Sequence, residues 1–145
     1  MLLQANFVYH CKKFFLKKIK PSFIPAIAWS VITTVLLVLP GSSLPQETWF
    51  DNIAPDKWIH AFIFAVMVVL WCRASLRMYT TAAQLKKAFI LFAILWLVYG
   101  IAMEFVQQNF IPNRSFDVGD IIADGVGCVI GFFYSTKRYI KNRPL

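Results

Sequence analysis

Charged residues are scarce in this sequence: they make up 15% of its 145 residues, and only seven of them are acidic. A soluble domain usually carries about 25% charged residues, whereas here hydrophobic residues reach 59%. This composition excludes a soluble globular domain and indicates a membrane protein. The three cysteines do not suggest a disulfide framework. The H-E-x-x-H and G-x-S-x-G motifs of familiar hydrolases are also absent.

The sequence contains four long apolar runs. They cover residues 22–39, 58–72, 88–106 and 121–133. The second and fourth runs approach the ~20 residues that cross a bilayer only if residues 56–60 and 117–120 form their outer helical turns. We therefore predict an all-α fold, a polytopic bundle of four transmembrane helices.

Basic residues predict the orientation of the bundle. All of them except Lys57 and Arg114 precede the first run, separate the second from the third, or follow the fourth, while the acids fall in the other loops and adjoining helix ends. Short loops rich in Lys and Arg stay in the cytoplasm. We expect a multi-pass membrane protein with both termini cytoplasmic and its acidic side facing outward. The net charge of +8 then belongs to a surface beside anionic lipid, and no nucleic-acid partner is inferred.

The expected domain organisation has three parts. Residues 1–21 form a basic amphipathic segment or simply a basic topogenic tail, residues 22–136 the four-helix transmembrane domain, and residues 137–145 a basic cytoplasmic tail. The first apolar run is longer than a signal-peptide core and lacks a clear small-x-small cleavage site, so we interpret it as a retained helix.

Polar residues recur at helical spacing at three of the predicted helix ends. Glu104 and Gln107 are three apart, and Asp56 and His60 are four apart. A third stripe consists of Asp117, Asp120 and Asp124. Each set shares one helix face. Because ionised groups cost about 2.5–3.5 kcal/mol at mid-bilayer even on lenient scales, the stripes should face one another.

A convergence of several carboxylates needs positive charge to offset their mutual repulsion. Two like charges ~4 Å apart repel by about 4 kcal/mol at an effective dielectric of 20. Protons on one or two acids, a bound metal ion, or Lys57 and Arg114 could supply the compensation. Glu104, near a helix C-terminus, is the acid most expected to hold a proton.

Small residues follow the last predicted helix at intervals of four: Ala123, Gly127, Gly131 and Ser135. This spacing predicts a ridge on which a neighbouring helix approaches closely. Asp120 and Asp124 lie about 60° from the ridge, since three residues advance a helix by about 300°. The ridge would hold both acids toward the bundle interior.

These motifs together resemble the VanZ-like family. The matching elements are DKWIH at 56–60, EFVQ at 104–107, Arg114, Asp117, Asp120 and DGVGCVIG at 124–131. The resemblance implies a small four-helix, multi-pass protein of the bacterial inner (plasma) membrane, with its polar site facing the periplasm or exterior. It is of the type that lowers susceptibility to teicoplanin, and the resemblance names no reaction. Asp124 stands where that family commonly has Asn, which adds a negative charge to the cluster.

Three functions fit these observations. The first, ranked highest, is binding of an anionic or polar envelope ligand, either a lipid head group or a lipid-linked precursor, in an outward-facing polar pocket. This pocket is predicted to consist of Asp56, Lys57, His60, Glu104, Gln107, Arg114, Asp117, Asp120 and Asp124. No cofactor is required for this function.

The second function is a metal-dependent hydrolase of a phosphate or peptide bond, with a divalent cation on His60, Glu104, Asp120 and Asp124. The third is an accessory or scaffold subunit with a protein partner or a second copy. Plain structural roles remain open for single residues. Glu104 and Arg114 could form a buried ion pair, Asp117 could be an N-cap, and Lys57 could extend its ammonium toward water.

Overall fold

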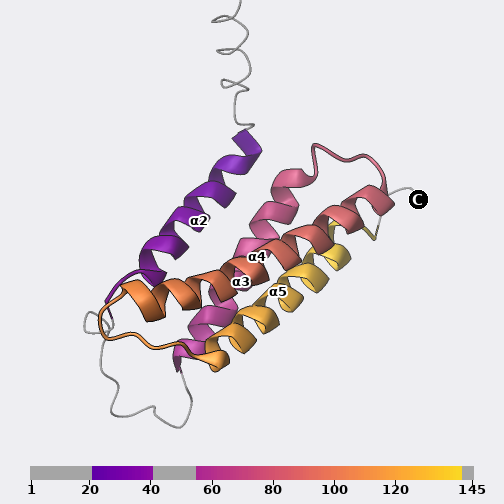
Figure 1. The fold of residues 1–145 in the computed structure, drawn as a ribbon. Coiled ribbons are helices and arrows are strands. Elements are labelled where there is room, and N and C mark those ends of the chain that lie inside the picture. The colour runs from indigo at the N-terminus through magenta and orange to yellow at the C-terminus, as the bar shows by residue number, and fades with distance from the viewer. Residues whose placement is uncertain (1–20, 41–54, 142–145) are drawn as a thin grey trace, which may run out of the picture.

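The computed structural model describes residues 21–40 and 55–141, and over these ranges the chain is helical with no strand (Figure 1). A 3₁₀ turn, η1 (Pro21–Phe23), leads into α2 (Ile24–Leu37). The remaining helices are α3 (Pro55–Ser75), α4 (Ala82–Phe110) and α5 (Val118–Tyr139). The all-α prediction is confirmed for this part of the chain. The predicted N-terminal segment, apart from residue 21, and residues 142–145 of the predicted tail lie outside the described residues.

Local capping explains where two of the helices begin. The Thr81 hydroxyl accepts the Gln84 N–H at 3.3 Å, and the Gln84 side chain accepts the Thr81 N–H at 3.4 Å. This capping box starts α4 at Ala82, six residues before the predicted apolar run. Asp117 caps α5 by accepting the Gly119 N–H at 2.6 Å. The structural alternative proposed for Asp117 is therefore confirmed.

Three helices, α3, α4 and α5, are long and apolar enough to cross a membrane, which indicates a membrane protein. Residues 56–60 form the first turns of α3, as its spanning length required. By contrast, α2 has 14 residues and a length of about 21 Å at 1.5 Å per residue, which is less than the ~30 Å of a bilayer core. The first predicted span is thus shorter than expected.

Close packing of α3 against α5 organises the bundle. A Cβ added at Gly127 would collide with the carbonyl oxygen of Ala61, and one at Gly131 would lie 2.7 Å from the carbonyl oxygen of Ala65. The predicted small-residue ridge is therefore confirmed as the contact surface of α5. Because these contacts advance along both helices together, α3 and α5 run parallel.

The other helices pack around this pair. Both α3 and α5 contact α4, and α2 contacts α3. Phe64, Met67 and Phe89 are fully buried between the helices, whereas apolar side chains such as Ile94 and Phe133 point outward and are exposed. An exposed apolar face of this kind suits contact with lipid rather than water.

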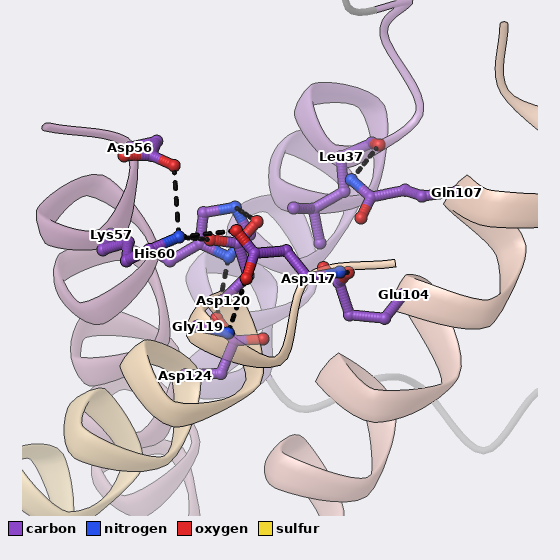
Figure 2. Close-up of polar contacts among 10 residues, drawn as sticks. All are labelled: Leu37, Asp56, Lys57, His60, Glu104, Gln107, Asp117, Gly119, Asp120 and Asp124. Atoms are coloured by element: carbon purple, nitrogen blue, oxygen red, sulfur yellow. Dashed lines mark hydrogen bonds and ion pairs between the residues drawn. The ribbon is translucent and has the colours of Figure 1, made fainter. Parts of the chain in front are cut away.

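Helix direction places charges of opposite sign at opposite ends of the bundle. The starts of α3 and α5 meet the ends of α2 and α4 at what we call the acid-rich end (Figure 2). This end contains Asp56, Glu104, Asp117, Asp120 and Asp124. The opposite, basic end contains Arg73, Arg77, Lys86, Lys87, Lys137 and Arg138.

Candidate functional site

The Lys57 ammonium lies among three carboxylates at the acid-rich end (Figure 2). Its Nζ is 2.7 Å from Asp117 Oδ2, 3.1 Å from Asp120 Oδ1 and 3.4 Å from Asp56 Oδ2. The side chains of Asp56 and Asp117 are 58% and 45% exposed, whereas that of Asp120 is 8% exposed. Lys57 therefore links an accessible rim to a buried layer, and it does more than extend its charge toward water.

Asp117 joins two helices to the start of a third. Its carboxylate accepts from Lys57 of α3 and from the Gly119 N–H of α5. Its own backbone N–H donates to Glu104 Oε2 of α4 at 2.9 Å. The Lys57 ammonium, with the Gly119 N–H, holds the pKa of Asp117 below its usual value. Asp117 is consequently ionised at neutral pH.

His60 carries the polar network into the buried part of the bundle. Its Nδ1 lies 2.9 Å from Asp124 Oδ1, a hydrogen-bond distance, while its Nε2 lies 3.8 Å from Asp120 Oδ2. The side chains of all three residues are less than a tenth exposed. An ionised carboxylate only accepts hydrogen bonds, so an ionised Asp124 requires the proton on Nδ1.

Two glycines that the sequence reasoning did not select provide space for these side chains. A Cβ at Gly119 would lie 2.6 Å from Lys57 Cε and 2.9 Å from Asp117 Oδ1. One at Gly100 would collide with the Asp124 carboxylate. The only available sequence signal was that Gly100 precedes Glu104 by one helical turn and so shares its polar face.

Gln107 and Glu104 do not play equivalent roles. Gln107 is buried, but its Nε2 donates to the carbonyl oxygen of Leu37 at 2.8 Å, and Figure 2 shows it directed toward α2. It therefore satisfies a C-terminal carbonyl of that helix. Glu104 is also buried, and it accepts the backbone N–H of Asp117.

Arg114 lies apart from the contacts described above. It is half-buried in the loop between α4 and α5, and its Nε is buried without a hydrogen-bond partner among the residues described. The proposed Glu104–Arg114 ion pair is wrong, since no ion pair joins these two described residues. Of the nine predicted site residues, seven are linked by contacts, while Gln107 binds α2 and Arg114 stands without an ion pair to a described carboxylate.

A cation is already built into the carboxylate cluster. Asp56, Asp117 and Asp120 each bring one oxygen within 4.8 Å of the others, a separation compatible with a shared metal ion. The Lys57 ammonium lies within 3.4 Å of all three residues. A metal ion bound there would have to displace this ammonium. The described residues do not group the predicted ligands His60, Glu104, Asp120 and Asp124 in the same way.

The cluster therefore has two chemically different parts. Its rim offers a positive charge and carboxylate acceptors side by side, and its buried layer offers a histidine between two acids. Comparison with protein families, curated proteins and solved structures gives no match to this chain. Functional interpretation rests on the residues and their geometry.

Proposed function

We propose that this chain is a membrane protein of VanZ-like type, in which η1, α2 and the residues up to 40 form a fourth span beside α3, α4 and α5. We propose further that it binds, at its acid-rich end, the polar head group of an envelope lipid or lipid-linked precursor. The acid-rich end faces the periplasm or exterior of a bacterial inner membrane, and both termini lie in the cytoplasm. The gathering of basic residues at the opposite end supports this orientation. A fluorescent protein fused to the C-terminus should fluoresce and alkaline phosphatase fused there should be inactive; the reverse pattern contradicts the orientation.

The observation that carries the proposal is the polar network extending from the exposed rim at Lys57 to the buried Asp124. Charged groups in membrane helices reduce stability, and replacing a buried ion pair by apolar residues is often neutral or stabilising. Here the network spans three helices, and Gly100 and Gly119 keep it free of steric conflict. A binding role accounts for this arrangement better than a role in holding the bundle together.

The charge balance of the site limits the class of ligand that it can bind. The five described acids exceed Lys57 and Arg114, so a ligand bearing several negative charges would be repelled. A head group with one phosphate or carboxylate together with hydroxyl, amide or amine donors complements both the positive groups and the carboxylates of the site. Its anionic group would pair with Lys57 or Arg114, and its donors would reach Asp56 and Asp117.

Lipid binding by the purified protein tests the proposal. Full-length protein would be titrated with phosphatidylethanolamine, as a lipid with one phosphate and one amine, and with an undecaprenyl-linked envelope precursor that carries a single phosphate, using native mass spectrometry. Lys57→Gln and Arg114→Gln should each weaken binding of at least one of these by about tenfold, which is 1.4 kcal/mol. Gly125→Ala should not, because a Cβ there meets only Leu97 Cδ1 at 3.7 Å.

Gly119→Ala separates binding from folding. The atoms that its Cβ would meet first belong to the flexible end of Lys57, which can move away without changing the packing of the helices. We expect weaker binding with a melting temperature no lower than that of Lys57→Gln, which loses the same ion pairs. Unchanged binding in Gly119→Ala, Lys57→Gln and Arg114→Gln alike would refute the proposal, and a loss of membrane abundance in each would favour the scaffold role. In cells, teicoplanin susceptibility of strains expressing the same variants provides the readout that the family resemblance suggests.

A metal-dependent hydrolase is the second candidate, favoured by the spacing of Asp56, Asp117 and Asp120. Elemental analysis of chelator-washed protein, wild type beside Asp120→Asn, tests it directly. One divalent ion per chain, lost in the variant, would place this function first. If Lys57 instead fills the position, Lys57→Met should bind a divalent cation more tightly than wild type does.

A further inference from the structure

A cavity at the basic end of the bundle lies far from the network described above. It has a volume of about 440 Å³ and lies between η1, the start of α2 and the end of α3. Its lining consists of Ser22, Pro25, Leu70, Arg73, Leu76 and Arg77. Two arginines and a serine thus share a cavity whose remaining lining is apolar.

The two arginines have no described carboxylate to neutralise them. Arg73 lies in the last turn of α3 and Arg77 four residues later, and neither forms an ion pair with the residues that the structure describes. Asp56 at the other end of α3 is 17 positions away, about 26 Å along the helix axis. At that distance Asp56 cannot form an ion pair with either arginine. The positive potential around the cavity is therefore left to a ligand or to solvent.

The serine adds a hydrogen-bond donor to the cavity. Ser22 Oγ is buried and has no hydrogen-bond partner among the described residues. The Ser22 hydroxyl can therefore donate to an anion held by the arginines.

The position in the bilayer identifies the source of the anion. The candidate span of α3 ends at Ser75, between the two arginines, so the cavity lies at the level where a bilayer has its head groups. Leu70, Leu76 and Pro25 provide apolar surface beside the charges. A free phosphate would leave this surface uncovered, whereas a phospholipid could cover it with its glycerol and upper acyl carbons.

We propose that the cavity lined by Arg73, Arg77 and Ser22 binds the phosphate of an anionic membrane phospholipid. The guanidinium groups pair with the phosphate oxygens, for which their forked geometry is suited. The Ser22 hydroxyl donates a further hydrogen bond, and the apolar lining contacts the lipid backbone. This site is separate from the acid-rich end and does not depend on the function proposed there.

Lipid titration with charge-matched variants tests this site. Full-length protein in a neutral detergent would be titrated with phosphatidylglycerol and, separately, with phosphatidylcholine, again by native mass spectrometry. Arg73→Gln with Arg77→Gln should weaken phosphatidylglycerol binding by about tenfold or more. Lys86→Gln with Lys87→Gln removes the same charge from exposed positions at the start of α4 and should leave binding nearly unchanged. Equal losses in both double variants, or equal affinity of wild type for the two lipids, would overturn the proposal.

Two further arms identify the bound group and guard against misfolding. Glycerol 3-phosphate at millimolar concentration should not displace phosphatidylglycerol; displacement would assign the cavity to a soluble phosphate and overturn the lipid assignment. Should the glutamine variant fail to fold, Arg73→Lys with Arg77→Lys keeps the charge but loses the fork. It should bind phosphatidylglycerol more weakly than wild type, and unchanged affinity would contradict guanidinium pairing.

Discussion

Replacing Gly127 by alanine tests the helix packing on which the acid-rich end depends. The added Cβ would collide with the Ala61 carbonyl oxygen and lie 3.0 Å from both the Ala61 carbonyl carbon and Phe64 Cβ. The first two are backbone atoms, so no side-chain rotation relieves the overlap. The two helices must separate instead. Overpacking of this kind costs about 1–3 kcal/mol.

Gly125→Ala is the matched control because it makes the same substitution two residues away on the same helix. Its Cβ would meet only Leu97 Cδ1, at an ordinary contact distance of 3.7 Å. Alanine in a helix is favoured over glycine by about 0.5–1 kcal/mol, but this gain is the same at both positions of α5 and cancels in the comparison. We therefore expect the free energies of unfolding of the two variants to differ by the overpacking cost of about 1–3 kcal/mol, with Gly125→Ala the more stable.

Thermal unfolding of the purified proteins in one detergent, followed by tryptophan fluorescence, measures this difference. At about 2–4 °C per kcal/mol, the melting temperature of Gly127→Ala should fall several degrees below that of Gly125→Ala. Equal melting temperatures, or a more stable Gly127→Ala, would show that α3 and α5 do not pack as described. The arrangement of the polar network would then have to be reconsidered with it.

Three other predictions concern the polar network. Because Lys57 lowers the pKa of Asp117, the stabilisation from its charge is present above the ordinary carboxyl pKa and is lost as pH falls through the lowered value. Asp117→Asn keeps a side chain that can cap the helix but removes the negative charge. The variant should therefore have a lower melting temperature than wild type near neutral pH, and the difference should vanish in acid. A difference that grows on acidification would contradict this prediction. His60→Leu leaves the buried Asp124 carboxylate without its histidine and should cost about 3–5 kcal/mol, whereas His60→Leu with Asp124→Leu should cost less, as a double-mutant cycle by thermal unfolding would measure. Additive losses would mean that the two side chains do not interact. Gly100→Ala should displace Asp124 and lower stability by about 1–3 kcal/mol in the same assay, and a neutral effect would contradict the close contact between them.

Local patterns predicted much of the fold. Apolar runs predicted membrane helices, and α3, α4 and α5 extend beyond the predicted runs because polar caps and charged turns continue them. The length of α2 was overestimated: the run from residue 22 to 39 begins with a 3₁₀ turn and its helix ends at Leu37. Hydropathy measures how apolar a segment is, but it does not report where helical hydrogen bonding stops.

The residues of the candidate site were predicted less accurately than the helices. Helical spacing correctly indicated which faces of α3 and α5 carry the acids, because a period of 3.6 residues fixes direction around an axis. The same reasoning included Gln107, which instead donates to the end of α2. Arg114 was included for its positive charge, and it has no ion pair with the described residues. Helical spacing predicts the helix face on which a residue lies and its depth in the membrane, but it does not identify the neighbouring helix.

The sequence by itself determined that this is a helical membrane protein with acids at one end, basic residues at the other and a small-residue ridge on its last helix. Only the tertiary structure decided that Lys57 lies among three carboxylates, that His60 pairs with Asp124, and that Gly100 and Gly119 leave room for them. The physical reason is that pairing depends on how each helix is rotated and shifted against its neighbours. Here that register is fixed by the contact of α5 with the backbone of α3, a long-range interaction that no local pattern contains.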